Sequence, residues 1–418
     1  MVANRGPYLL GGIMLEHRGL RRRILAVAAA SIAATAAAGV AEASPGTPTG
    51  PAITITLPAP TGPDPVGVTE LHLIDANRAD PWDPSRRREL MVQIWYPADD
   101  ANSSPLAPWM PPGGREEQSY YLTQSGVASG SWALAPSHSR SDEPARAGSG
   151  QFPILLNSPG MDDTTGLSTA QAEDLASHGY VVVAINHTHE AFAVQFPDGR
   201  TEHSAVPLDS PPDILPDLLV PTRVADARFV LDQLAAAAGH STDAGPALPP
   251  RLADDLDLTK VGMFGHSLGG STTAQTMHDD SRVAAGVDLD GPILGSVSTD
   301  GLDRPLLMLA SDTSPWFGHA GWEPYWVTNT GLKLPLRITG TRHMSLTDEQ
   351  VIVSALATAG LLSADVKNEA IGSIDASRSV DLQRSCLLAY FDAVFGRSDT
   401  SPAEIIKRLA QPEILPHL

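Results

Sequence analysis

A serine stands at the centre of a G-x-S-x-G motif in the stretch VGMFGHSLGGSTTAQ, which runs from Val261 to Gln275. The residues before Ser267 form an apolar strand pattern, and those after it form a helical pattern. A serine on a tight turn between a strand and a helix forms a nucleophile elbow, in which the flanking glycines avoid clashes and the hydroxyl is exposed. The alternative is an ordinary glycine-rich turn with a capping serine. The strand and the helix on either side favour a nucleophile at Ser267.

A serine hydroxyl becomes a strong nucleophile only when a base takes its proton and an acid orients that base. In folds that carry a nucleophile elbow, the order along the chain is serine, acid, histidine. The histidines downstream of Ser267 are His278, His319, His343 and His417. His278 belongs to the helix of the elbow and His417 lies near the chain end. His343 follows a predicted strand, in a loop before a helix, which is the expected place for the base.

Two aspartates are candidates for the acid. Asp290 ends the predicted strand RVAAGVDLD, the first strand after the elbow, and Asp288 lies deeper on the same strand. Asp312 follows the next predicted strand, RPLLMLAS. Both Asp290 and Asp312 are therefore expected at the edge of the sheet where the base arrives. Their spacing from Ser267 leaves both assignments open.

The elements around these residues predict an α/β fold. Apolar strands alternate with helical patterns from residue 152 onward, which is typical of a mostly parallel central sheet with helices on both faces. Residues 98–150 lack strong periodicity, and PLDSPPDILPDLLVP is either a lid or a crossover loop, so we expect a loop-rich lid or pocket region. We predict one α/β-hydrolase domain over residues 67–418, preceded by a Pro- and Gly-rich linker or edge segment at 44–66.

The N-terminal segment has the pattern of an export signal. Arginines at 18 and 21–23 precede an alanine-rich apolar run, which ends at the small residues Ala41-Glu42-Ala43. This order predicts a secretory signal peptide over residues 1–43, of the twin-arginine type, with cleavage after Ala43. The run is too short and too poor in Leu and Ile to be expected as a lasting membrane span. We therefore expect a secreted, extracellular protein.

The overall composition is that of a globular protein. Of 418 residues, 42% are hydrophobic, and the net charge of −20 would repel a phosphate backbone, so no nucleic-acid partner is expected. Cys386 is the only cysteine, which excludes an internal disulfide, and it shares an apolar helical face with Leu382, Leu387 and Tyr390. We therefore predict that Cys386 is buried in the core.

The segment His187-Thr188-His189-Glu190 is the nearest approach to a metal motif. Two histidines at positions i and i+2 of a strand end can bind zinc. No further ligands follow at a metal-binding spacing, and the chain has no H-E-x-x-H motif, phosphate loop or dinucleotide fingerprint. We expect a structural or pocket-rim role for this segment, and neither a metal nor a cofactor.

Aromatic residues gather in SPWFGHAGWEPYW, directly after a predicted strand. This segment is either a packed loop, or an apolar wall of the substrate pocket or a patch that contacts a lipid interface. In the second case Trp316, Phe317 and His319 would line the pocket.

The region from residue 152 to residue 348 resembles the secreted platelet-activating-factor acetylhydrolases and their bacterial lipase-like relatives. The stretches that carry the resemblance are PILLNSPGMDD, DLASHGYVVVAINH, GMFGHSLGG, GVDLDGPI and TGTRHMSLTD. RELMVQIWYPA and APWMPP also resemble an early strand and a pocket-side loop of that family. The chain departs from the family at Pro159–Gly160, where the family usually has His-Gly.

This resemblance implies that Ser267 is the nucleophile, Asp290 the acid and His343 the base. One oxyanion donor is expected to be the backbone N–H of Leu268, the residue after the nucleophile. The family match indicates the N–H of Met161 as the second donor. The implied function is a serine carboxylic-ester hydrolase acting on lipid esters, above all phospholipids with a short acyl chain. The alternatives are a broad-specificity lipase or cutinase-like polyester hydrolase, and a non-catalytic binding protein on the same scaffold.

Overall fold

The computed structural model describes residues 52–99, 103–147, 151–207, 210, 214–239, 245–314, 322–401, 404–409 and 411–416. The predicted signal peptide at 1–43 and the candidate pocket residues Trp316, Phe317 and His319 lie outside these ranges.

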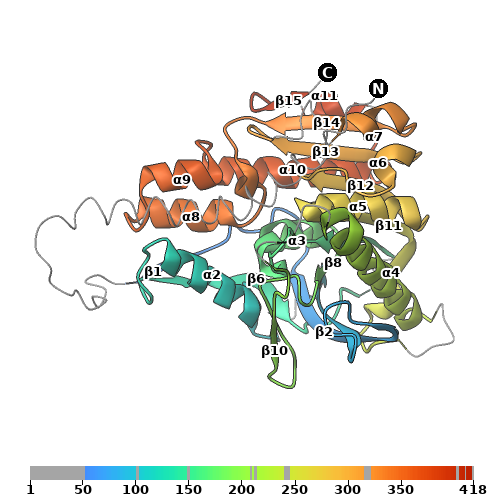
Figure 1. Ribbon diagram of the computed structural model, residues 1–418, viewed down its shortest axis with the longest axis horizontal. Helices are drawn as coiled ribbons and strands as arrows, with labels where there is room; N and C mark the ends of the chain where they lie inside the picture. The colour runs from blue at the N-terminus through green and yellow to red at the C-terminus, as the bar shows by residue number, and fades with distance from the viewer. Residues whose placement is uncertain are drawn as a thin grey trace, which may run out of the picture.

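An 11-stranded sheet runs through the molecule in the order β15-β14-β13-β12-β11-β7-β8-β3-β2-β6-β4 (Figure 1). Its parallel centre consists of β7 (Phe152–Ser158), β8 (Val181–Asn186), β11 (Leu256–His266), β12 (Val283–Leu289), β13 (Leu306–Ser311) and β14 (Lys333–Ile338). Next to β8, the strands β3 (Arg87–Pro97) and β2 (Val66–Ala79) are antiparallel, and β15 (Ile414–Pro416) pairs antiparallel with β14. The mostly parallel sheet confirms the predicted α/β fold class.

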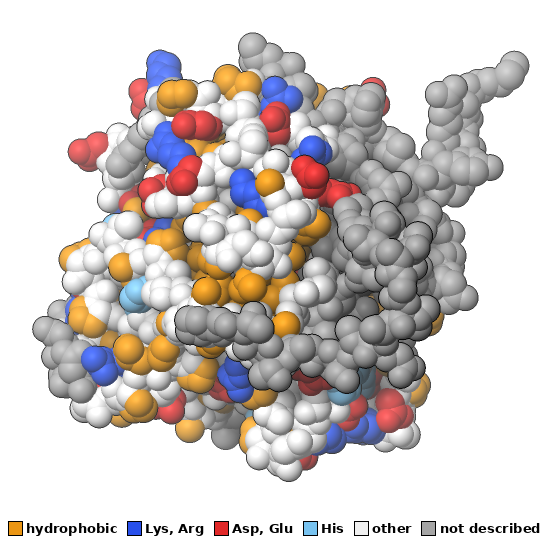
Figure 2. Space-filling view, turned by 90° about the vertical axis from the view of Figure 1, so that its left-hand side faces the viewer, with side chains coloured by type: hydrophobic (Ala, Val, Ile, Leu, Met, Phe, Trp, Pro, Cys, Tyr) orange, Lys and Arg blue, Asp and Glu red, His pale blue; other side chains and the backbone are white. Residues whose placement is uncertain are grey.

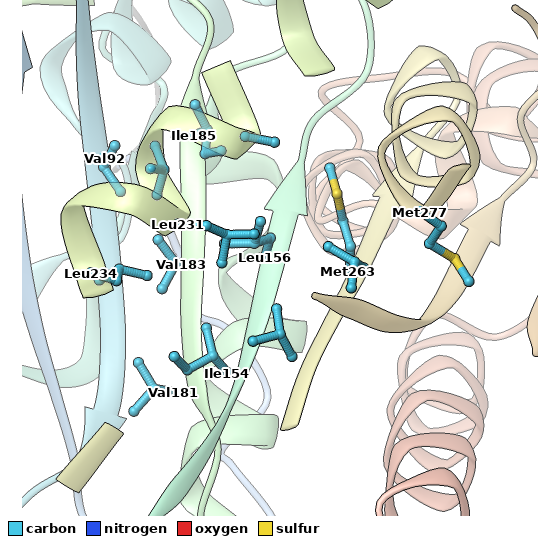
Figure 3. Close-up of a cluster of buried hydrophobic side chains, with 14 of the residues drawn as sticks. Val92, Ile154, Leu156, Val181, Val183, Ile185, Leu231, Leu234, Met263 and Met277 are labelled. Atoms are coloured by element: carbon cyan, nitrogen blue, oxygen red, sulfur yellow. The ribbon is translucent and has the colours of Figure 1, made fainter. Parts of the chain in front are cut away.

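Helices cover both faces because the central strands are apolar on both sides. On one face, Ile154, Leu156 and Val183 pack against Leu231 and Leu234 of α4 (Val220–Ala237), in the cluster that also includes Met277 of α5 (Leu268–Asp279) (Figure 3). On the other face, Leu155, Val182 and Phe264 pack in a cluster with α3 (Thr169–Ser177) and α10 (Ala376–Val394). Alternate residues of β7 therefore stabilise opposite layers of the molecule.

Cys386 lies in this second layer and is fully buried, as predicted. Burial raises the pKa of its thiol to about 12. The side chain therefore acts as a small apolar residue of α10 rather than as a reactive thiol.

Residues 98–150 contain more regular structure than their composition predicts. They form β4 (Leu106–Pro108), α2 (Pro112–Gln124), β5 (Trp132–Leu134) and β6 (Pro136–Ser141). The described part of the 44–66 segment includes β1 (Ile53–Ile55), which pairs in parallel with β5 and buries Ile55. This part is an edge element packed on the domain rather than a free linker.

Two short strands, β9 (Ala193–Gln195) and β10 (Thr201–His203), form a separate antiparallel sheet. The other α-helices of the described residues are α6 (Val297–Asp300), α7 (Glu323–Thr328), α8 (Glu349–Thr358), α9 (Ala364–Ile371) and α11 (Ile405–Arg408). His343–Leu346 form a short 3-10 helix. Across the described ranges, every helix is too short or too polar to cross a membrane.

Candidate active site

The ends of the parallel strands bring the predicted site residues to one edge of the sheet. Ser158 at the end of β7 is in register with Gly265 of β11, and His266 is in register with Leu289 of β12. The residues that directly follow these strand ends are Pro159, Ser267 and Asp290. Three loops that are distant in sequence therefore start side by side.

Ser267 occupies a strained turn between β11 and α5. Its backbone has φ 55° and ψ −119°, a conformation that a residue with a side chain rarely adopts. The turn is held by a hydrogen bond from the Ser267 N–H to the carbonyl of Leu289 at 2.9 Å. A Cβ at Gly265 would overlap the backbone of Gly269, and one at Gly269 would overlap the carbonyl oxygen of Ser158. The flanking glycines are therefore required by close backbone approach, as a nucleophile elbow demands.

His343 and Asp290 form a hydrogen-bonded pair beside this turn. Nδ1 of His343 lies 2.7 Å from Oδ2 of Asp290, whose other oxygen accepts the N–H of Ser311 at 2.9 Å. Burial alone would raise the pKa of Asp290, but the hydrogen bond and charge of His343 outweigh it and lower the pKa. Because the ionised carboxylate only accepts, Nδ1 donates and Nε2 of a neutral His343 is left as the basic nitrogen.

His343 and Asp290 are each linked to the elbow, His343 through His266 and Asp290 through Leu289. The ring of His266, the residue before Ser267, lies 4.4 Å from the ring of His343, and its Nε2 donates to the His343 carbonyl at 3.0 Å. Asp290 directly follows Leu289, which accepts the Ser267 N–H. Asp290 is completely buried, whereas His343 keeps 22% of its side chain exposed. The histidine is thus the member of the pair that a substrate can reach.

Asp312, the alternative acid, is engaged elsewhere. Its Oδ2 accepts the N–H of Gly340 at 2.9 Å, and its Oδ1 lies 3.7 Å from Nε of Arg337. Its own N–H donates to Oγ1 of Thr341 at 3.1 Å. These contacts tie together the loops after β13 and β14. Of the two candidate aspartates, Asp290 is the one that contacts His343.

Met161 and Leu268, the predicted oxyanion donors, lie on neighbouring segments. Met161 is in the loop that follows β7, and Leu268 is the first residue of α5. Both side chains are buried in the same apolar cluster. The first N–H groups of a helix have no acceptor within the helix, and its positive end favours negative charge. The loop after β7 packs directly on this helix end, as the crowding of Ser158 against Gly269 requires.

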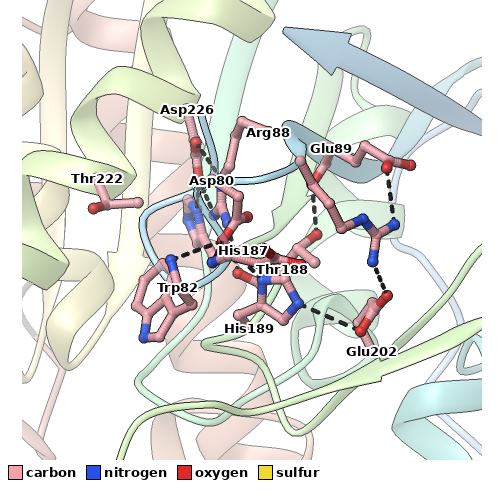
Figure 4. A network of polar contacts seen from close by, with 12 residues as sticks. Asp80, Trp82, Arg88, Glu89, His187, Thr188, His189, Glu202, Thr222 and Asp226 are labelled. Carbon is pink, nitrogen blue, oxygen red and sulfur yellow. Dashed lines mark hydrogen bonds and ion pairs between the residues drawn. The ribbon is translucent and has the colours of Figure 1, made fainter. Parts of the chain in front are cut away.

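The segment His187–Glu190 has structural contacts. His187 is buried and bridges Oγ of Ser158, at 2.9 Å from Nε2, and Oδ2 of Asp226, at 2.9 Å from Nδ1. His189 bridges Asp80 and Glu202 (Figure 4). Burial and the nearby Arg223 charge lower the pKa of His187 to about 4, so this imidazole is neutral at pH 7. Within the described residues, no group of His, Cys, Asp and Glu side chains could hold a metal ion.

An apolar cleft lies between α2, α8 and α9, and Met344, the residue after His343, is one of the residues that line it. The cavity holds about 50 Å³. Figure 2 views the molecule from the side of α2, α8 and α9, and shows hydrophobic side chains gathered across the middle of this face. In the described part of the aromatic segment, Trp322 and Tyr325 are buried, whereas Trp326 is 41% exposed.

Sequence reasoning missed two groups of residues near the site. His266, inside the G-x-S-x-G motif, supports the backbone of His343. Arg223 and Asp226 of α4 contact the end of β7 and the loop after it, directly or through His187. A signal for them exists in the sequence, because both are charged residues at positions of α4 that share a buried face with its apolar side chains.

Several known proteins are similar to this chain in sequence or in structure. The profile of the family "Platelet-activating factor acetylhydrolase, isoform II" matches residues 51–205 and 249–401. A probable 1-alkyl-2-acetylglycerophosphocholine esterase of Arthroderma benhamiae is 27% identical over 367 residues, with 82% of this chain and 89% of that protein covered. A platelet-activating factor acetylhydrolase of Cavia porcellus is 26% identical, with 62% of this chain and 61% of that protein covered.

A solved ferulic acid esterase from Streptomyces cinnamoneus is similar in structure, with a TM-score of 0.69 and 31% sequence identity. The alignment covers 87% of this chain and 99% of that one. The family match extends over most of the chain and includes Ser267, Asp290 and His343. The chain therefore belongs to the platelet-activating factor acetylhydrolase isoform II family and is a carboxylic ester hydrolase.

Proposed function

We propose that the chain is a serine esterase that hydrolyses lipid esters, with phospholipids that carry a short acyl chain as its principal substrates. The observation that carries the proposal is the hydrogen-bonded pair of His343 and Asp290, which packs against the elbow that presents Ser267. The names of the relatives from Arthroderma benhamiae and Cavia porcellus support the substrate class.

In the proposed reaction, Nε2 of His343 takes the proton of the Ser267 hydroxyl, and Oγ of Ser267 attacks the ester carbonyl carbon. The negative charge that develops on the carbonyl oxygen is stabilised by the N–H groups of Met161 and Leu268. His343 then gives its proton to the departing alcohol oxygen as the carbon–oxygen bond breaks, and an acyl-serine remains. Water, deprotonated by His343, attacks this ester, and His343 returns the proton to Oγ of Ser267 as the carboxylic acid is released. Asp290 stays ionised throughout and stabilises the protonated imidazole.

We propose that the acyl group of the substrate enters the cleft that Met344 helps to line. Its volume of about 50 Å³ is small compared with the roughly 300–1,000 Å³ of pockets that enclose a drug-sized ligand. A two-carbon acyl group needs little apolar space, whereas a long chain would have to extend along the surface between α2, α8 and α9. We therefore expect the rate to fall as the acyl chain lengthens.

The test is hydrolysis of a series of 1-alkyl-2-acyl-glycerophosphocholines with acyl chains of increasing length, by the wild type and by Ser267→Ala. We expect the acetyl ester to be preferred, and Ser267→Ala to lose about 10³-fold or more in kcat. A fluorophosphonate probe should label the wild type and not the variant. Full activity in Ser267→Ala would contradict the assignment of Ser267 as the nucleophile. Failure of the probe to react with a folded wild type that hydrolyses none of the esters would favour a non-catalytic binding protein.

A second candidate is an esterase of hydroxycinnamate esters. It is favoured by the structural similarity to the ferulic acid esterase. Methyl ferulate, long-chain triglycerides and a polyester film, assayed beside the acetyl phospholipid, separate this candidate and a broad lipase from the primary proposal. A kcat/KM for methyl ferulate above that for the acetyl phospholipid would favour the second candidate.

We also propose that the protein is exported. The support is the arginine-rich and alanine-rich sequence of residues 1–43. Expression of the full chain in a bacterium with a twin-arginine export system should release a protein whose N-terminal residue is Ser44. Replacement of the arginines at 21–23 by Gln should keep the protein inside the cell, whereas retention of the wild type would contradict this part of the proposal.

A further inference from the structure

Arg223 is a buried arginine that contacts the loop after β7, which carries the predicted oxyanion donor Met161. It lies on the first turns of α4 and is 1% exposed. Its Nη1 donates to the carbonyl of Pro159 at 2.6 Å, and its Nη2 donates to the carbonyl of Gly160 at 3.1 Å. Its Nε donates to Oε2 of the buried Glu190 at 2.7 Å. One guanidinium therefore fixes two consecutive peptide groups while a carboxylate fixes the guanidinium.

The contact of Arg223 with the carbonyl of Gly160 sets the direction of the N–H of Met161 through the geometry of the peptide bond. The carbonyl of Gly160 and the N–H of Met161 belong to the same planar, trans peptide group, so they point in opposite directions. A guanidinium bound to the oxygen therefore sets the direction of the N–H on the other side. It also draws electron density toward the oxygen, which makes the N–H a stronger donor.

A second contact from the same helix fixes the start of the loop. Asp226, one turn after Arg223, accepts from His187, whose other nitrogen contacts Oγ of Ser158, the last residue of β7. Asp226 is itself held by the fully buried Arg88, whose Nη2 lies 2.6 Å from its Oδ2. Figure 4 shows Asp226, His187 and Arg88 converging at this point. The helix α4 thus anchors the loop at Ser158 and again at Pro159 and Gly160.

We propose that Arg223 is a positioning residue of the oxyanion hole, which orients and polarises the Gly160–Met161 peptide group so that the N–H of Met161 faces the reacting carbonyl. This inference rests on the proposed function, since it requires ester hydrolysis at Ser267. Glu190 has the supporting role of holding the guanidinium in the orientation that reaches both carbonyls.

The test compares Arg223→Met with Arg384→Met. Arg384 is a matched control because it is also buried, at 3% exposure, and donates to backbone carbonyls, those of Pro58, Ala59 and Ala170, which lie outside the loop after β7. We expect Arg223→Met to lower kcat for a short-chain p-nitrophenyl ester by about 10- to 100-fold, a part of the loss seen when an oxyanion donor is removed. KM should change by less than about threefold. Arg384→Met should lower the melting temperature and leave kcat unchanged.

A trifluoromethyl ketone gives a readout that a purely structural role would not change. Ser267 adds to its carbonyl, and the resulting oxyanion takes the place of the transition-state oxygen. Arg223→Met should weaken this inhibitor by the same factor as kcat. Arg223→Lys, which keeps the charge but not the planar fork, and Glu190→Gln should move both quantities in the same direction, and they serve if Arg223→Met fails to fold.

The failure of this inference differs from the failure of the proposed function. If Ser267→Ala is inactive while the Arg223 variants keep wild-type kcat and inhibitor affinity, the positioning role is wrong and the esterase remains. If Ser267→Ala keeps its activity, the proposed function itself is wrong. If the Arg223 variants lose activity only in proportion to the loss of folded protein, and the folded fraction keeps wild-type kcat as expected for Arg384→Met, Arg223 is a structural residue.

Discussion

The imidazole of His343 donates from Nδ1 to the buried carboxylate of Asp290 over 2.7 Å, and its ring packs against that of His266, the neighbour of Ser267. Asp290 and His343, the proposed acid and base, thus come from the segments that follow β12 and β14, and they meet beside the turn that follows β11.

Replacement of the two candidate acids should have opposite outcomes. Asp290→Asn should lower kcat by about 10⁴-fold, because the amide no longer selects the tautomer of His343 that accepts a proton at Nε2. Asp312→Asn should keep most of the activity, because Asp312 contacts Gly340 and Arg337 instead. Steady-state hydrolysis of a short-chain ester measures both. A silent Asp290→Asn together with an inactive Asp312→Asn would reverse the assignment of the acid.

Gly269→Ala should damage the elbow. The added methyl group would overlap the carbonyl oxygen of Ser158, which belongs to a central strand and cannot move freely. We expect a loss of about 1–3 kcal/mol in the free energy of unfolding, as for other overpacked sites, together with a marked fall in kcat. Urea denaturation and the ester assay measure the two effects.

Gly360→Ala provides the control for the glycine substitution. Gly360 has φ +73° with open space around it, so alanine there meets backbone strain but no clash. It should cost about 1 kcal/mol in stability and leave kcat unchanged. Equal activity of both glycine variants would contradict the close approach of α5 to the loop after β7.

Asp348 should make the protein less stable as the pH rises. Burial raises its pKa to about 7, although N–H groups of Ala170 and Trp109 favour the charged form. The folded protein therefore holds this proton more tightly than the unfolded chain does. The stabilising contribution is complete below the ordinary pKa of 3.8 and is lost as the pH rises through about 7.

Urea denaturation of the wild type and of Asp348→Asn at pH 5 and pH 8 measures this effect. The free energy of unfolding should fall less between the two pH values in the variant than in the wild type. Asp303→Asn, at an aspartate whose side chain is 82% exposed, should keep the wild-type difference. An unchanged difference in Asp348→Asn would show that the carboxyl group is charged in the folded protein at both pH values.

Leu155→Ala should test the second hydrophobic layer. Leu155 is fully buried on the face of β7 that packs under α3 and α10. The cavity should lower the free energy of unfolding by about 2–5 kcal/mol. Val327→Ala, at a side chain that is 82% exposed, should change it by less than about 0.5 kcal/mol. Similar losses in both variants would contradict the packing of β7.

The central strands and the elbow could be predicted from the sequence because their signals are local. Each strand is a short apolar run, and Ser267 stands between two glycines that mark the turn. The choice between Asp290 and Asp312 could not be made in this way, since both follow consecutive parallel strands. It depends on which loop reaches His343, and that distance is set by the packing of the whole sheet edge.

The helix α2 could not be predicted from the sequence for a different reason. Its first turn contains Gly113 and Gly114, which weaken a helical pattern. In the folded protein, Gly113 lets the helix approach the backbone of Ala193 so closely that a Cβ there would overlap the carbonyl oxygen. The helix therefore depends on tertiary contact with β9, and this contact leaves no periodic signal along the chain.

The burial of Cys386, a residue of α10, has a practical consequence. Because the thiol is buried and the chain has no second cysteine, the stability of the native state does not depend on the redox conditions of its surroundings. Production in a reducing cytoplasm and production in an oxidising medium should therefore yield the same enzyme, and reducing agents can be left in or out of its assays without affecting its fold.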